Sequence, residues 1–189
     1  MRGLSILCLG TIAAAVLGCY APPPTFGELP DFALTAVSAG SKPKPLTRAD
    51  LSGRAWLADF VFTNCEGPCP ALSNNMARLQ KNLPKDVGLL TFTVDPDRDS
   101  PEILEAYARR FRADPARWLF VTGAKAPLLK LLIGGFKLPV VEDSGAPSGQ
   151  RVTHSTRLVL IDAKGNIRGY FDGDDEVGFR AAARAARRL

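Results

Sequence analysis

Residues Trp56 to Pro70 read WLADFVFTNCEGPCP and contain the clearest fold signal of the chain. The first seven of these residues are mostly apolar and are bounded by turn-forming residues, a pattern typical of a buried central strand. Pro70 suits the first turn of a helix, after which apolar residues recur at helical spacing: Leu72, Met76, Leu79 and Leu83. The stretch therefore predicts a strand, a turn that holds Cys65 and Cys69, and a helix.

The rest of the chain continues this alternation. Strands are predicted at 32–37, 87–94, 118–121, 156–162 and 167–171, helices from 101 onward and at 127–133 and 174–189, a short helical turn at 46–53 and a long loop at 136–152. The final two strands are joined by a four-residue turn and read as a hairpin. This order predicts an α/β sandwich in which helices flank a mixed central sheet.

The first residues have the pattern of an export signal. Arg2 is followed by an apolar run at 4–17 that is too short to span a bilayer, and Gly18 and Cys19 come next. We expect a lipoprotein signal peptide at 1–18, a lipidated Cys19 that opens a Pro-rich tether at 19–25, and a single domain at 26–189. The alternative is an ordinary signal peptide with a chance cysteine. Either way the chain is expected to be exported, and the lipid would anchor it to a bacterial membrane, facing the periplasm or the cell exterior.

Only two of the four cysteines remain for chemistry. Cys8 leaves with the signal and Cys19 carries lipid, which leaves Cys65 and Cys69. A domain of about 170 residues buries a sizeable core, and a disulfide across so short a loop removes little unfolded-state entropy. Two thiols four residues apart lie on one face of a helical turn. They can chelate a soft metal ion or oxidise to a disulfide, so a chemical role is favoured over a structural one.

His154 is the only histidine of the chain and the expected partner of the two thiols. Two thiolates and one imidazole suit copper, whereas a closed zinc site requires four ligands. The alternative is that His154 is simply a hydrogen-bonded residue of the core or surface. Because Cys69 stands at a helix start, unpaired N–H groups and the helix dipole are expected to lower its thiol pKa.

An acidic turn follows the second buried strand. Asp95 stands at the carboxyl end of this strand, on the edge of the sheet where the two thiols are predicted. We expect Asp95 to support the site from its second coordination sphere or to offer an extra oxygen ligand. Asp99 and Ser100 are expected only to shape the turn and to cap the helix that follows.

The positive net charge of +5 belongs to the two ends of the chain. Without Arg2 and the arginines of the last ten residues, basic and acidic residues number 19 each; these arginines are Arg180, Arg184, Arg187 and Arg188. A solvated helix end whose arginines favour the helix dipole is one interpretation, and attraction to anionic lipid headgroups is the other. Nucleic-acid binding is not expected, since the basic residues are not interleaved with aromatic ones.

With these motifs assembled, the chain resembles the SCO/SenC family of thioredoxin-like copper proteins. The resemblance covers about 26–179 and rests on FVFTNC with Cys69 and Pro70, on TVDPDRDSP at 93–101, and on His154 shortly before LVLID at 158–162. It implies a thioredoxin fold and one copper ion held by Cys65, Cys69 and His154. In this chain, residues 66–68 read EGP, where Pro-x-x is commoner in the family.

The resemblance also implies a function. Family members deliver copper, or reducing equivalents, to the binuclear copper centre of cytochrome c oxidase. The leading hypothesis is therefore a membrane-tethered metallochaperone whose partner is the copper-site subunit of the oxidase or another copper chaperone. The alternative is a thiol-disulfide reductase that acts on partner cysteines through Cys65 and Cys69.

Overall fold

The computed structural model describes residues 24–142, 145 and 152–189, and of 142 and 152–154 it describes the backbone only. The predicted signal peptide at 1–18, Cys19 and most of the tether at 19–25 lie outside the described residues. Within the described part of the chain, no helix is long and apolar enough to cross a lipid bilayer.

The centre of the fold is a seven-stranded sheet in the order β2-β1-β5-β4-β3-β8-β9. Its strands are β1 (Ala33–Val37), β2 (Lys44–Thr47), β3 (Trp56–Val61), β4 (Gly88–Thr93), β5 (Trp118–Thr122), β8 (Arg157–Ile161) and β9 (Ile167–Asp172). The three central strands β3, β4 and β5 run parallel, and all other pairs are antiparallel. The predicted mixed sheet is confirmed.

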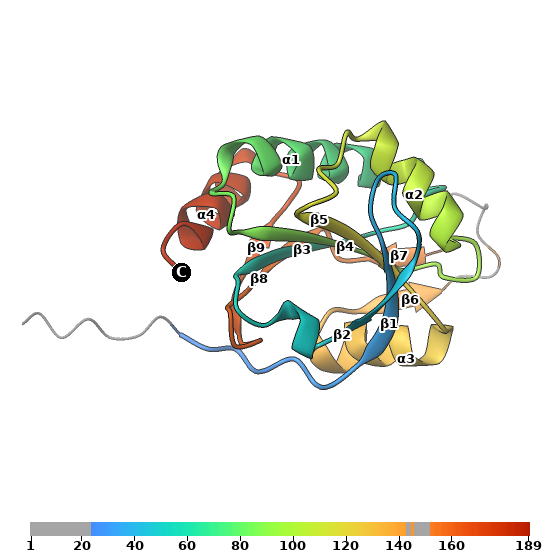
Figure 1. Cartoon of the computed structure of the whole chain (residues 1–189), viewed down its shortest axis with the longest axis horizontal. Helices are drawn as coiled ribbons and strands as arrows, with labels where there is room; N and C mark the ends of the chain where they lie inside the picture. The colour runs from blue at the N-terminus through green and yellow to red at the C-terminus, as the bar shows by residue number, and fades with distance from the viewer. Residues whose placement is uncertain (1–23, 143–144, 146–151) are drawn as a thin grey trace, which may run out of the picture.

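Helices cover both faces of this sheet and make the sandwich three layers deep (Figure 1). Three of them lie on one face: α1 (Cys69–Asn82), α2 (Pro101–Arg110) and α4 (Glu176–Ala186). On the other face lies α3 (Lys125–Lys130), which continues directly into a π-helical turn, η2 (Leu131–Gly135). A thioredoxin-like α/β fold is therefore what these residues form.

The sequence pattern explains why the central strands lie between the layers. Every residue of β3, β4 and β5 is buried, which matches their nearly continuous apolar runs. On α1 the buried positions include Leu72, Met76 and Leu79, the predicted apolar stripe. Ser100 caps α2 by accepting a hydrogen bond from the backbone N–H of Ile103, as expected.

Two segments differ from the prediction. Residues 44–47 form the edge strand β2, and only Ala49–Leu51 (η1) has the helical turn that was expected from residue 46 onward. The loop predicted at 136–152 contains two short strands, β6 (Val140–Glu142) and β7 (Val152–His154), which pair as a separate antiparallel ribbon. Both errors concern strands of three or four residues, which are too short for a period of two to stand out in the sequence.

Candidate metal centre

Cys65 and Cys69 lie where β3 ends and α1 begins. Cys65 follows β3 by four residues and its backbone N–H donates to the carbonyl oxygen of Phe62 at 3.2 Å, which closes a tight turn. Cys69 is the first residue of α1. Both thiols are reduced, and their side chains form a hydrogen bond with each other. The predicted dithiol is therefore assembled at the carboxyl end of β3, one of the three central strands of the sheet.

The two thiols differ in exposure. Cys69 is fully buried, whereas Cys65 is partly exposed and lies next to the exposed residues Asn64 and Glu66. Burial raises the pKa of the Cys69 thiol, and its hydrogen bond with Cys65 and the negative charge of Asp59 act in the same direction. The expectation that the helix start lowers this pKa is wrong, because desolvation of a buried thiolate outweighs the dipole of a single helix end.

Asp99 stabilises the backbone turn that leads to the dithiol. Its buried carboxylate accepts hydrogen bonds from the backbone N–H of Thr63 at 3.1 Å, from the Thr63 hydroxyl at 2.5 Å and from the Thr93 hydroxyl at 2.5 Å. Thr63 is only two residues before Cys65. Asp99 therefore ties the turn of the dithiol to the end of β4, and the expectation that it only shapes its own turn is wrong.

Asp95 has a more local set of contacts. Its carboxylate forms an ion pair with Arg98 at 3.0 Å, and its backbone N–H donates to the Thr93 hydroxyl. Burial raises the pKa of Asp99, and the negative charge of Asp95 adds to this rise. The two carboxylates are thus close enough to interact, but among the described contacts it is Asp99 that reaches the dithiol turn.

The segment that carries His154 enters the sheet beside α1. His154 ends β7, where its backbone is paired with Val140 of β6. Two residues later, the carbonyl oxygen of Thr156 accepts from the N–H of Gly173, and Asn75 of α1 donates to the carbonyl oxygen of Gly173 at 2.8 Å. Because β8 runs antiparallel to β3, the start of β8 lies at the end of β3 that leads to Cys65.

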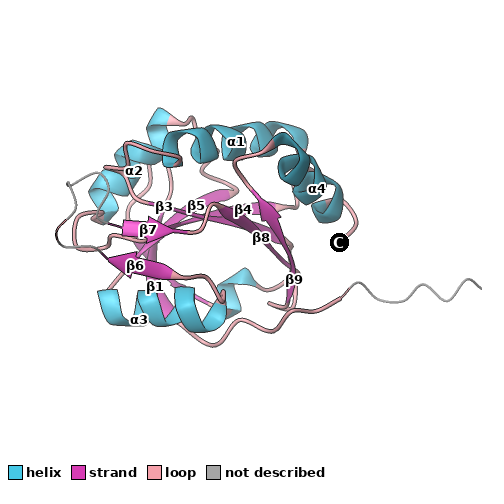
Figure 2. Cartoon of the chain, turned by 180° about the vertical axis from the view of Figure 1, so that it is seen from behind, coloured by secondary structure: helices cyan, strands magenta, loops and turns pink. Residues whose placement is uncertain are grey.

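The chain that leads into β6, the other strand of the ribbon, is anchored against β3 and β4. The ring of Phe136 packs against Phe60 of β3 and Phe92 of β4, with ring centroids 5.0 and 5.1 Å apart. β6 begins four residues later. Figure 2 shows the β6–β7 ribbon at the end of the long axis opposite the carboxyl end of α4. The backbone thus brings His154 to the region of the dithiol, while its side chain lies outside the described part of the structure.

The donor set of the described residues suits a soft ion in low coordination. Among side chains that the structure describes, no three Cys, His, Asp or Glu residues gather as a metal site. The two adjacent thiols by themselves fit Cu(I), which accepts two thiolates, and do not make a closed zinc site. A third ligand would have to come from a segment such as the one that holds His154.

A buried polar row continues from the dithiol into the core. The hydroxyl of Tyr107 on α2 is hydrogen-bonded to that of Ser73, one turn after Cys69 on α1, at 2.9 Å. Asp59 lies in the middle of β3 and accepts from the Thr91 hydroxyl at 2.6 Å, while among the described residues its Oδ2 has no partner. Burial raises the pKa of both Cys69 and Tyr107, and the negative charge of Asp59 adds to this rise. In the sequence, Asp59 stands out as the single charged residue of an otherwise apolar strand.

Replacing Asp59 with asparagine is expected to weaken the pH dependence of stability. Burial raises the pKa of Asp59 from 3.8 to about 7, so the folded chain keeps a proton that the unfolded chain releases above about pH 4. The free energy of unfolding of the wild type therefore falls as the pH rises from about 4 to about 7, by on the order of a few kcal/mol. Urea unfolding across this range measures the slope.

The Asp59→Asn variant would keep an acceptor oxygen for Thr91 and lose the titration. Because the variant differs from the wild type in absolute stability as well, the slopes and not the midpoints are compared. The slope that remains combines opposite contributions, because burial raises the pKa of Asp99, whereas hydrogen bonds lower the pKa values of Glu105 and Glu176. A variant profile as steep as that of the wild type would contradict the assignment to Asp59.

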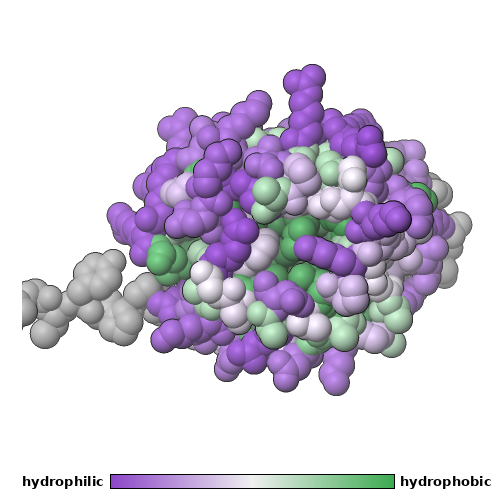
Figure 3. Space-filling model, in the orientation of Figure 1, coloured by the Kyte–Doolittle hydropathy of each residue, from purple (hydrophilic) through white to green (hydrophobic). Residues whose placement is uncertain are grey.

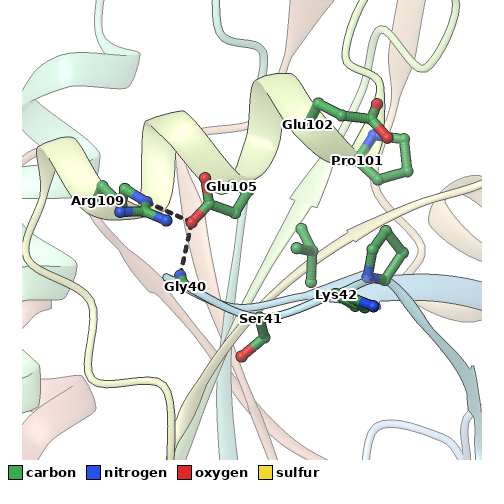
Figure 4. A pocket seen from close by; sticks show the side chains of 9 residues that line it. Gly40, Ser41, Lys42, Pro101, Glu102, Glu105 and Arg109 are labelled. Carbon is green, nitrogen blue, oxygen red and sulfur yellow. Dashed lines mark hydrogen bonds and ion pairs between the residues drawn. The ribbon is translucent and has the colours of Figure 1, made fainter.

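A surface hollow, separate from the dithiol, lies between α2 and the turn that follows β1 (Figure 4). Glu105 occupies it and accepts hydrogen bonds from the backbone N–H of Gly40 at 2.6 Å and from Arg109 at 2.5 Å. The carboxylate and the guanidinium neutralise each other. These contacts fasten the β1–β2 turn to α2, and we assign no binding role to this hollow.

Comparisons with known proteins agree with this geometry. The family model described as SCO1/SenC matches residues 30–188. A SCO1 protein homolog of Bacillus subtilis is 32% identical over 134 residues, which cover 69% of this chain and 68% of the relative. The crystal structure of a SCO1/SenC family lipoprotein from Bacillus anthracis is 34% identical, with a TM-score of 0.75, and the match covers 86% of this chain and 95% of that one.

Two further solved structures share the fold. BsSco, described as a member of the Sco family of cytochrome c oxidase assembly proteins with a disulfide switch, is 27% identical, with a TM-score of 0.70 over 89% of this chain and 97% of that one. ScoI of Bradyrhizobium japonicum, solved with copper bound, is 23% identical, with a TM-score of 0.70 over 85% and 98%. At that identity the second match supports the fold alone. The family model, with the relatives above 30% identity, establishes that this chain belongs to the SCO1/SenC family.

Proposed function

We propose that the chain is a membrane-tethered copper-binding protein that delivers copper to the binuclear copper site of a respiratory cytochrome c oxidase. The observation that carries this proposal is the pair of reduced, hydrogen-bonded thiols at the junction of β3 and α1. Support for copper as the cargo comes from a relative of Stutzerimonas stutzeri, named "Putative copper-binding protein", which is 31% identical over 131 residues. Support for the acceptor comes from the description of BsSco as an oxidase assembly protein.

The chemistry follows from the unequal thiols. Both must lose their protons to bind Cu(I), and the raised pKa of Cys69 means that copper uptake releases a proton that the apo chain would hold at neutral pH. Cys65 is the more accessible sulfur and is the one that an incoming ligand can approach. Transfer would proceed by ligand exchange, in which a thiolate or imidazole of the acceptor binds copper as Cys65 leaves. In this proposal His154 is the third ligand and favours the Cu(II) form.

His154→Ala tests this assignment. The reduced wild-type chain is expected to bind one copper ion as Cu(I) or Cu(II), with a sulfur-to-copper charge-transfer band in the Cu(II) form. The variant is expected to keep Cu(I) on the two thiolates and to lose about 100-fold in Cu(II) affinity. Titrations in competition with a chelator of known affinity measure both. Unchanged Cu(II) affinity and spectrum in the variant would remove His154 from the site.

A second function is favoured by the difference in exposure between the thiols. A partly exposed Cys65 beside a buried Cys69 suits a reductase in which Cys65 attacks a partner disulfide and Cys69 resolves the mixed disulfide. Cys69→Ser is then expected to trap a mixed disulfide through Cys65 with the oxidised copper-site fragment of an oxidase subunit. Cys65→Ser is the matched control and should trap none. If the mixed disulfide no longer forms when His154 is also replaced, the result would favour copper delivery over disulfide reduction.

The location forms part of the proposal. Residues 1–18 would act as the signal peptide, Cys19 would carry the lipid, and 19–25 would tether the domain of 26–189 to the membrane, facing the periplasm or the cell exterior. The description of the Bacillus anthracis relative as a lipoprotein supports this arrangement. Asp95 remains a candidate second-sphere residue of the copper site.

A further inference from the structure

Four arginines line one groove between α1 and α4. The groove has a volume of about 350 Å³, and its charged lining consists of a single acid, Glu176, and of Arg78, Arg180, Arg184 and Arg187. In the sequence these arginines come from two segments about a hundred residues apart. The fold therefore gathers a net positive charge at one place, although the body of the chain carries equal numbers of acidic and basic residues.

Glu176 does not neutralise this groove. Its carboxylate pairs with Arg78 at 3.1 Å and with Arg180 at 2.8 Å, and the guanidinium of Arg78 also lies over the ring of Phe179. Arg187 donates to the carbonyl oxygen of Asn82 at the end of α1, which leaves its charge uncompensated. Arg184 is exposed and has no hydrogen bond or ion pair within the described part of the chain. The groove thus presents two guanidinium groups, those of Arg184 and Arg187, whose charge no described acid balances, with room for an anion.

The groove lies at the end of the molecule from which the tether leaves. In Figure 1 the described chain begins at the same end of the long axis as the carboxyl end of α4, and hydrophilic side chains cover α1 and α4 there in Figure 3. From Cys19 to Pro24, the first described residue, the chain spans at most about 17 Å. With the chain attached at Cys19, as proposed, this end stays close to the membrane surface.

We infer that the arginine groove docks on a membrane surface by binding the phosphate of an anionic phospholipid headgroup. Guanidinium groups bind phosphate oxygens bidentately, and each cation near an anionic membrane strengthens the attraction. The tether raises the effective concentration of the groove at this surface. The arginines at the end of α2 lie outside the lining of the groove, and there Arg109 is paired with Glu105.

Docking in this way would orient the metal centre. The β6–β7 ribbon lies at the other end of the long axis from the carboxyl end of α4. A domain that rests on its α1–α4 groove therefore holds the dithiol end away from the lipid, toward a partner in the aqueous space. This inference adds an orientation to the proposed function and does not depend on copper.

The test uses the full chain on vesicles and an arginine-specific reagent, phenylglyoxal, with peptide mass spectrometry as the readout. Modification rates are compared in phosphatidylcholine vesicles, in vesicles that also contain phosphatidylglycerol, and in phosphatidylcholine vesicles with added inorganic phosphate. Arg184 and Arg187 are expected to react about fivefold more slowly with phosphatidylglycerol only, and high salt should abolish the protection. Arg109 and Arg110 serve as internal controls and should react equally in all samples.

Each other outcome overturns the inference. Equal protection by inorganic phosphate would define a free-anion site, protection that depends on protein concentration would define contact between two copies, and equal reactivity everywhere would mean no docking. The paired variants Arg184→Gln/Arg187→Gln and Arg109→Gln/Arg110→Gln change only exposed side chains. Only the first pair should lose the protection that phosphatidylglycerol gives to the remaining groove arginines. Copper affinity should stay unchanged in both, so a failure here is distinct from a failure of the proposed function.

Discussion

Replacing Cys65 and Cys69 together with serine is expected to abolish stoichiometric copper binding. Serine hydroxyls stay protonated at neutral pH and are hard ligands, whereas Cu(I) binds thiolate sulfur. Without both sulfurs, the described part of the candidate site keeps no soft donor. The affinity for Cu(I) is expected to fall by at least about a thousandfold, which exceeds what the loss of a supporting residue causes. Competition with a Cu(I) chelator, followed optically, measures the loss.

Stability separates loss of the site from loss of the fold. Serine is close to cysteine in volume, but a buried hydroxyl at 69 needs a hydrogen-bond partner, so a cost of about 1–3 kcal/mol is expected there. Cys65→Ser, at the partly exposed position, should cost much less. A double variant that unfolds cooperatively and still binds copper as tightly as the wild type would refute the proposed site.

Asp99→Ala is the second change with a large expected effect. It removes the acceptor of three hydrogen bonds and leaves the Thr63 N–H and the Thr93 hydroxyl without their partner in partly or fully buried positions. We expect a loss of about 3–5 kcal/mol in the free energy of unfolding. Since Thr63 is two residues from Cys65, the dithiol turn should also loosen, with a loss of about 10-fold to 100-fold in copper affinity. Chemical unfolding and copper titration measure the two effects.

Asp99→Asn and Asp95→Ala are the matched controls. Asparagine keeps one acceptor oxygen in place and should restore most of the copper affinity, even where stability is only partly recovered. Asp95→Ala removes an ion pair within one turn and should change stability by less than about 1 kcal/mol. A loss of copper affinity in Asp95→Ala but not in Asp99→Ala would show that Asp95, and not Asp99, supports the copper site. If all three variants bind copper as tightly as the wild type, neither carboxylate supports the site.

The alternation of strands and helices, the dithiol turn and the family were predictable from the sequence because their signals are local. Continuous apolar runs indicate buried strands, the spacing of Leu72, Met76 and Leu79 indicates one face of a helix, and Ser100 before Pro101 indicates a helix start. The short strands β2, β6 and β7 were not predicted, because three or four residues are too few to show the alternation of apolar and polar residues that indicates a strand. Their pairing depends on partners that the sequence does not place nearby.

The groups that can do chemistry are evident from the amino-acid sequence: two thiols, one imidazole and a set of arginines at the end of the chain. How these groups behave depends on the folded structure. It buries Cys69 and raises its pKa against the pull of the helix start, and it joins Asp99 to Thr63 across 36 positions of sequence. It also brings Arg78 beside the arginines of α4. Desolvation, hydrogen bonding and charge density depend on neighbours in space, and these neighbours exist only once the layers have packed.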